Sequence, residues 1–157
     1  MNSRTRLAAV SALLIVAALS APASAQSIKS VAGTYALVSN PVFGDAPRGQ
    51  MILSADGTYS SILGRATLPK FASGNRTKGT PEENKAVIDG TNSHYGTYTI
   101  DDDGKTLTMN ITMGTFPNWD GVTQKRALKV SGDQLTYTVT APSGGGAPID
   151  VVWKKLK

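Results

Sequence analysis

The sequence predicts an all-β protein, and within that class an eight-stranded antiparallel barrel with one short helix between its third and fourth strands. Apolar and polar residues alternate along several short segments, which is the period of a strand with one buried face. Tight turn signals such as Asp56-Gly57 join neighbouring segments into hairpins. Consecutive hairpins favour an up-and-down barrel over a two-sheet sandwich, and closure of the barrel leaves no exposed edge.

The alternation is clearest in residues 105–113, where Leu107, Met109 and Ile111 share one face and threonines occupy the other. An eight-stranded barrel has an interior that side chains can just fill, or that can hold one small ligand. The expected strands are residues 33–39, 50–54, 58–63, 95–100, 105–113, 122–130, 134–140 and 149–156.

Residues 69–90 interrupt this pattern and predict a loop followed by a short helix. Thr80 can cap the helix, Pro81 suits its first position, and Glu83 completes a capping box. Gly90 is a natural place for the helix to end. We expect this insertion to lie across one mouth of the barrel, either as a lid over a ligand or as a plug that closes the core.

The first 25 residues have the layout of a secretory signal peptide. Arg4 and Arg6 form a basic start, residues 7–19 are apolar or small with one serine, and residues 23–25 are small, as cleavage requires. The apolar run is shorter than the roughly 20 residues of a membrane span. We therefore expect a signal peptide over 1–25, a barrel domain over 26–157, a secreted or periplasmic location, and no membrane segment after cleavage.

The amino-acid composition excludes several kinds of functional site. The chain has no cysteine and one histidine, His94, so disulfides, thiol nucleophiles and a typical zinc site are excluded. The acidic turn at residues 101–104 lacks the ligand spacing of a calcium loop. Basic residues are scattered despite a net charge of +5, which does not indicate a nucleic-acid partner. We expect no metal and no cofactor.

Candidate ligand-binding residues come from polar side chains on inward faces. In residues 122–130 two lysines occupy one face, so Gln124 and Arg126 must lie on the inner face. An inward arginine requires a carboxylate, carbonyl groups or an anionic ligand. His94 and Tyr98 share a face of the fourth strand, and all four side chains are expected to approach one cavity. A structural alternative pairs Arg126 with Asp120 or with the last strand.

The segment Phe116-Pro117-Asn118-Trp119 is an aromatic hairpin loop. We expect Trp119 and Asn118 either to line the barrel mouth or to form a latch against the insertion. His94 can also serve as one general base, although no catalytic triad spacing can be read from the sequence. No catalytic residue is assigned.

Four segments, GTYALVS, FASGNRTKGTPEE, HYGTYTID and FPNWDGVTQKRAL, occur in this order. Together they resemble the bacterial lipocalin-like domain family of small calycin-type barrels, over roughly residues 33–153. Gly33-Thr34-Tyr35 is similar to the Gly-x-Trp signature of lipocalins, with Tyr35 in place of tryptophan. The resemblance implies a barrel and a small apolar ligand. It also implies that a basic residue closes the barrel base over an aromatic ring, a role that Arg126 and Tyr35 would fill.

Three functions are compatible with these observations. The first is an exported protein that binds a small apolar molecule, with an acidic or carbonyl head group, in the barrel cavity. The second is a small barrel enzyme of the isomerase or cyclase type that acts on an apolar substrate. The third is a structural protein with a filled core. The sequence does not decide between binding and catalysis, because it gives no cavity volume.

Overall fold

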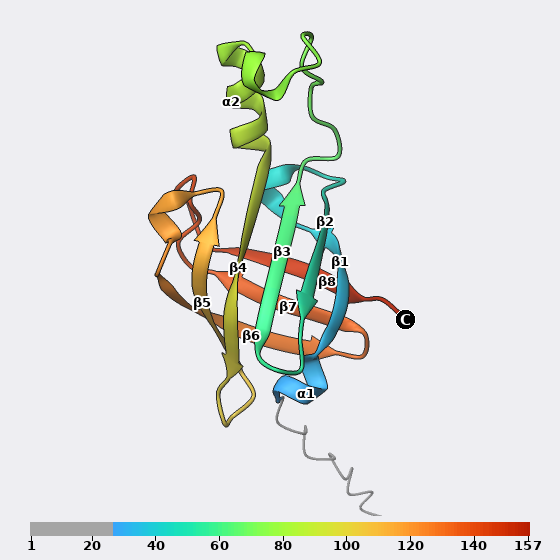
Figure 1. Cartoon of the computed structure of the whole chain (residues 1–157). Coiled ribbons are helices and arrows are strands. Elements are labelled where there is room, and N and C mark those ends of the chain that lie inside the picture. Colours follow the sequence, from blue (N-terminus) through green and yellow to red (C-terminus); the bar gives the residue numbers. More distant parts are fainter. Residues whose placement is uncertain (1–26) are drawn as a thin grey trace, which may run out of the picture.

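The computed structural model describes residues 27–157 as a closed barrel of eight antiparallel strands, which confirms the predicted fold class. Each strand pairs with the next along the chain, and β1 pairs with β8 to close the barrel (Figure 1). The strands are β1 (Gly33–Ser39), β2 (Arg48–Leu53), β3 (Thr58–Gly64), β4 (Thr91–Ile100), β5 (Thr106–Gly114), β6 (Thr123–Ser131), β7 (Gln134–Val139) and β8 (Ile149–Lys155). The helices are α1 (Ile28–Val31) and α2 (Pro81–Gly90), with 3₁₀ turns η1 (Pro41–Phe43), η2 (Arg76–Lys78) and η3 (Pro117–Trp119).

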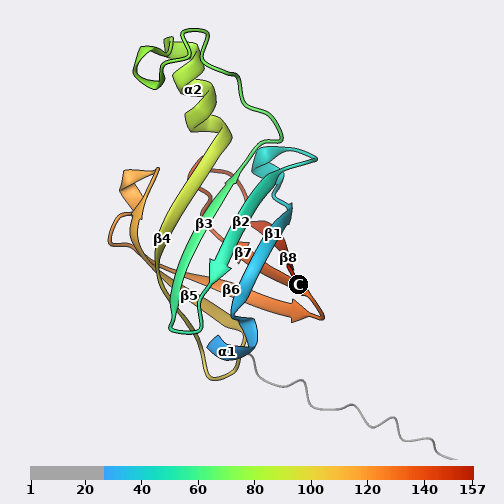
Figure 2. The ribbon, with the colours of Figure 1, turned by 45° about the vertical axis from the view of Figure 1, so that its right-hand side comes forward.

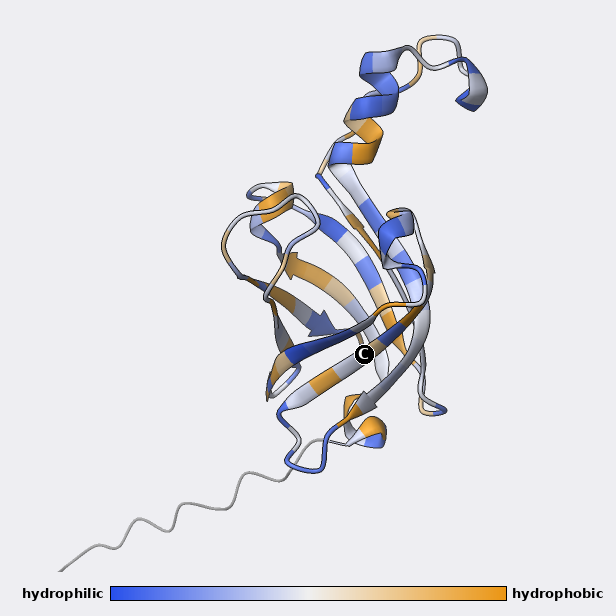
Figure 3. Ribbon diagram, turned by 90° about the vertical axis from the view of Figure 1, so that its left-hand side faces the viewer, coloured by the Kyte–Doolittle hydropathy of each residue, from blue (hydrophilic) through white to orange (hydrophobic). Residues whose placement is uncertain are grey.

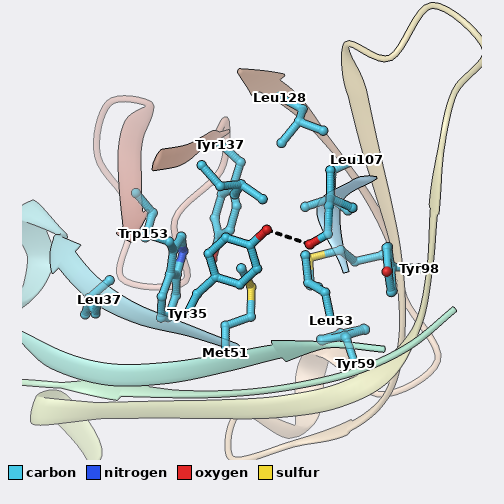
Figure 4. Close-up of a cluster of buried hydrophobic side chains, with 14 of the residues drawn as sticks. Tyr35, Leu37, Met51, Leu53, Tyr59, Tyr98, Leu107, Leu128, Tyr137 and Trp153 are labelled. Carbon is cyan, nitrogen blue, oxygen red and sulfur yellow. Dashed lines mark hydrogen bonds between the residues drawn. The ribbon is translucent and has the colours of Figure 1, made fainter. Parts of the chain in front are cut away.

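Large apolar and aromatic side chains fill most of the barrel interior. They come from alternate positions of the strands, as the period of two predicts. Trp153 and Tyr137 pack with ring centroids 6.5 Å apart, and Tyr35 and Met51 lie beside them (Figure 4). Because these groups occupy the middle and one end of the barrel, little interior space remains there. The fully buried members are Val31, Met51, Leu53, Tyr98, Leu107, Met109, Ile111, Leu135, Tyr137, Val151 and Trp153.

Helix α1 closes one end of the barrel, a feature that the sequence analysis did not predict (Figure 1). Its Val31 is completely buried, and the Val31 carbonyl accepts a hydrogen bond from the Tyr35 hydroxyl. At the same end the Tyr98 hydroxyl donates to the Ser54 carbonyl at 2.8 Å. These bonds satisfy the polar tips of two buried tyrosines, and α1 covers this end of the barrel.

Helix α2 forms as predicted, between β3 and β4. The Thr80 side chain accepts from the Glu83 backbone N–H, and the Glu83 side chain accepts from the Thr80 backbone N–H. The expected position across the barrel mouth is wrong, because α2 continues almost in line with β4 and projects away from the barrel (Figures 1 and 2). Only its last turn reaches the mouth. It therefore neither covers nor plugs the opening.

Several strand limits differ from the expected ones. The fourth strand begins at Thr91, directly after the helix, rather than at Tyr95. Residues 91–93 are polar, but they pair with residues 62–64 of β3 and so belong to the fourth strand. Val122 lies just before β6 and is 38% exposed, so it does not join the inner face assigned to it. No helix within residues 27–157 is long and apolar enough to cross a membrane. The predicted signal peptide lies outside the described residues.

Candidate functional site

A small cavity opens at the end of the barrel opposite α1. Its volume is about 50 Å³, well below the roughly 300–1,000 Å³ of a pocket that encloses a drug-sized ligand. Its wall combines aliphatic and aromatic groups with a few polar side chains from several elements. The lining residues are Asn40, Val42, Phe43, Leu63, Asn92, His94, Trp119, Arg126, Tyr137, Val139, Pro142, Ser143, Ile149 and Val151.

Arg126 contributes the positive charge of this cavity. It projects inward from β6 and is only 3% exposed. One terminal nitrogen donates to Gln124 Oε1 at 2.6 Å, and the guanidinium carbon lies 4.6 Å from the centroid of the Tyr137 ring. Its Nε has no partner, and no carboxylate among residues 27–157 forms an ion pair with it. A guanidinium has five N–H donors, so the cavity contains donors that lack acceptors.

His94 lies in the same cavity, at the inner face of β4. Its Nδ1 is 2.9 Å from the Tyr59 hydroxyl on the adjacent strand β3. Burial, and next the positive charge of Arg126, lower the pKa of His94 from 6.5 to about 3. The imidazole is therefore neutral at physiological pH. When the Tyr59 hydroxyl donates to Nδ1, the ring proton lies on Nε2 and forms a further donor.

A row of aromatic rings leads from His94 to the rim of the cavity. The ring of His94 meets that of Trp119 edge to face, with centroids 5.8 Å apart, and Trp119 meets Phe116 in the same way at 5.6 Å. Both aromatic residues lie in or just before η3. The hairpin loop that the sequence analysis singled out thus places Trp119 in the wall of the cavity, and Phe116 extends the apolar surface outward.

A family model described as a lipocalin-like domain matches residues 27–156, which is nearly the whole described chain. The chain belongs to the lipocalin-like domain family. No curated protein matches the sequence. The family is consistent with a closed barrel that binds a small molecule, and the open end of this lipocalin-like barrel holds a small cavity.

The lipocalin-like barrel brings three of the six predicted site residues to the cavity, namely Arg126, His94 and Trp119. Gln124 does not line this cavity; it hydrogen-bonds to Arg126 and lines a neighbouring pocket that also contains Arg126 and Trp119. Asn118 is exposed on η3, outside the cavity lining.

Tyr98 does not share the cavity with His94, contrary to expectation. The two residues are on one face of β4 but four positions apart, which separates them by about 13 Å along a strand. Tyr98 consequently lies at the closed end, where its hydroxyl bonds to Ser54. Its pKa is raised to about 12, first by burial and then by the neighbouring Tyr35 and Asp56. Strand alternation predicts the face of a side chain but not its depth in the barrel.

The expected contact between Arg126 and Tyr35 is also absent. Arg126 instead lies over Tyr137, and the basic residue near Tyr35 is Lys155, whose Nζ is 5.8 Å from the ring centroid. The alternative pairing of Arg126 with Asp120 is not seen either, and Asp120 Oδ1 accepts from the Gly114 backbone N–H. Arg126 is thus held in this lipocalin-like barrel by an amide and an aromatic ring.

The polar and aromatic groups of the site that the sequence did not point to include Tyr59, Tyr137 and Asn92. Tyr137 alternates with threonines together with Leu135, so the same test applied to residues 134–140 would have found it. Tyr59 was harder to find, because the inner face of its strand also holds Ser61 and the outer face holds Ile62. Asn92 precedes His94 by two positions on β4, and its Oδ1 is buried without a partner. It was missed because the strand was expected to begin after it.

Proposed function

We propose that this protein is an exported binding protein that holds a small, largely apolar molecule by an acidic or carbonyl head group in the cavity at the open end of its barrel. The observation that carries the proposal is Arg126, a buried guanidinium that lies beside an apolar cavity and forms no ion pair with any carboxylate of residues 27–157. An unpaired buried charge is costly. A ligand anion would supply the missing acceptor.

The neighbouring groups support an acceptor-bearing head group. The Nε of Arg126 and the ring N–H of neutral His94 are both donors, whereas Tyr59 orients the imidazole. Charge-assisted hydrogen bonds are about twice as strong as neutral ones. A carboxylate has two oxygens with which to accept from both residues. A carbonyl group would accept as well, but without the attraction of opposite charge.

The same geometry favours binding over catalysis. An efficient general base has a pKa near the working pH. The pKa of His94 is about 3, because it is buried beside Arg126, so its imidazole is a weak base at neutral pH. In this arrangement His94 serves better as a fixed hydrogen-bond donor than as a proton acceptor.

Export belongs to the proposal because of the basic start and apolar run in the first 25 residues. The chain has no cysteine, so outside the cytoplasm its fold has to be stable without disulfides. The closed barrel and its filled core meet that requirement.

Isothermal titration calorimetry with octanoate, octanamide and octanol tests the proposed binding. These compounds share a chain and differ in the head group, so the account predicts that the acid binds tightest and the alcohol weakest. Replacing Arg126 with methionine should remove the advantage of the acid, a loss of about tenfold to a hundredfold. Lys129→Met removes the same charge from the outer face of β6 and serves as the control. Equal affinity for the acid and the alcohol would contradict the proposal.

A further inference from the structure

We infer that the bound molecule is a carboxylic acid with an extended aliphatic chain, and that the chain lies outside the barrel, in a groove between η1, the last turn of α2 and the β5–η3 connection. This inference rests on the proposed function, because it assigns the head group of the ligand to Arg126.

The first argument is the size of the inner cavity. A cavity needs about 10–15 Å³ to hold one water molecule. The cavity beside Arg126 measures about 50 Å³, so it has room for a carboxylate and an adjoining carbon or two. A molecule with a larger apolar body must therefore leave most of that body outside.

The second argument is that a wider groove continues from the cavity. Its volume is about 360 Å³, and four residues line both spaces: Val42, Phe43, Asn92 and Ser143. A head group beside Arg126 would thus have its chain directed into the groove. The remaining lining residues are Arg65, Ile88, Asp89, Thr91, Thr115, Phe116 and Gly144.

The third argument is the apolar surface that the groove leaves uncovered. Ile88 in the last turn of α2 is 66% exposed, and Val42 in η1 is 46% exposed. Both side chains line the groove, with Phe116 from the β5–η3 connection. The start of α2 is hydrophilic, whereas its part nearest the barrel carries hydrophobic residues beside a hydrophilic one (Figure 3). An aliphatic chain would cover these groups, which gives the projecting helix a role as one wall of the groove.

The charges of the groove do not oppose an acid. Its one carboxylate among the lining residues, Asp89, forms an ion pair with Lys85. Arg65 also lines the groove and adds positive charge near the entrance. The groove therefore combines an apolar wall with a mildly positive approach to the cavity, as an amphiphilic anion requires.

Calorimetry with butyrate, octanoate and dodecanoate tests the inference. Each methylene that leaves water contributes about a fourfold gain in affinity. Because an open groove covers only part of the chain, octanoate should bind at least about tenfold more tightly than butyrate to the wild-type protein. Ile88→Ser should reduce that gain by at least about threefold and leave butyrate affinity nearly unchanged, because Ile88 lines the groove but not the inner cavity. Ile52→Ser is the control, because Ile52 is also exposed but lies on the outer face of β2.

Two results would overturn the inference. One is equal affinity for butyrate and octanoate in the wild-type protein, which would place the chain in solvent. The other is an equal loss of octanoate affinity in Ile52→Ser and Ile88→Ser, which would indicate nonspecific adsorption. Either result leaves the proposed function standing if Arg126→Met still weakens butyrate binding. If no acid of any length binds, the proposed function itself fails.

Discussion

Replacing Arg126 with methionine should leave the free energy of unfolding of the ligand-free protein nearly unchanged, or raise it. The variant loses a charged hydrogen bond to Gln124, which contributes about 1.5–3 kcal/mol, and a cation–π contact with Tyr137 of up to about 2 kcal/mol. It also removes the desolvation penalty of a buried guanidinium that has no ion-pair partner, which is several kcal/mol. Methionine keeps most of the apolar volume and adapts to an irregular cavity. These terms nearly cancel, so we expect a change within about 1 kcal/mol or a gain.

Urea unfolding of the wild-type protein, Arg126→Met and the exposed control Lys129→Met measures this difference directly. At the same octanoate concentration the stability of the wild-type and control proteins should rise by mass action, and that of Arg126→Met should rise less, because its affinity is about tenfold to a hundredfold lower. A loss of more than about 3 kcal/mol in the ligand-free variant would refute the reasoning, because Arg126 would then be a structural contact that holds the barrel together.

Three further predictions concern pH, packing and export. Because the pKa of His94 falls from 6.5 to about 3 on folding, the unfolded chain takes up a proton at this site over that pH range and the folded one does not. The free energy of unfolding should therefore fall by about 1.4 kcal/mol per pH unit as the pH drops below about 6.5, and this fall should be smaller in His94→Gln. An NMR titration of the single histidine that shows a pKa near 6 would contradict this prediction. In the same urea unfolding assay, Gly96→Ala should destabilise the barrel by roughly 3 kcal/mol or more, because a Cβ at this position would overlap the Asn110 carbonyl. Gly144→Ala is the control and should have little effect, because the space around Gly144 is open. The exported protein should begin at or within a residue or two of Gln26 by N-terminal sequencing, and an intact Met1 on a cytoplasmic product would disprove export.

Local sequence signals predicted most of the fold. Alternation places Leu107 and Met109 in the core, and the Thr80–Glu83 capping box begins α2 where expected. The sequence did not predict how distant segments are placed relative to one another. The direction of α2 depends on the continuous passage from Gly90 into β4, and a Cβ on Gly90 would collide with Leu68, a contact that no local pattern reveals.

For the candidate site, the sequence predicted which strand face each residue occupies but not which residues touch one another. Strand parity placed Arg126 and His94 inward, and both prove to be buried. Parity could not show that Tyr98 lies at the other end of the barrel, because depth depends on strand length and on how the strands tilt. Nor could it identify Tyr137 as the ring beneath Arg126, since that contact depends on which strands meet across the interior.

The central claim is that an acid head group binds to Arg126, and the side-chain N–H signal of this arginine tests it most directly. In an NMR titration of the ¹⁵N-labelled protein with octanoate, the Arg126 Nε–H resonance should shift strongly and saturate with the affinity measured by calorimetry, because this nitrogen is buried without a partner in the free protein. Octanol should leave the resonance nearly unchanged. If octanoate binds while the Arg126 Nε–H signal stays in place, the ligand lies elsewhere and the claim is contradicted.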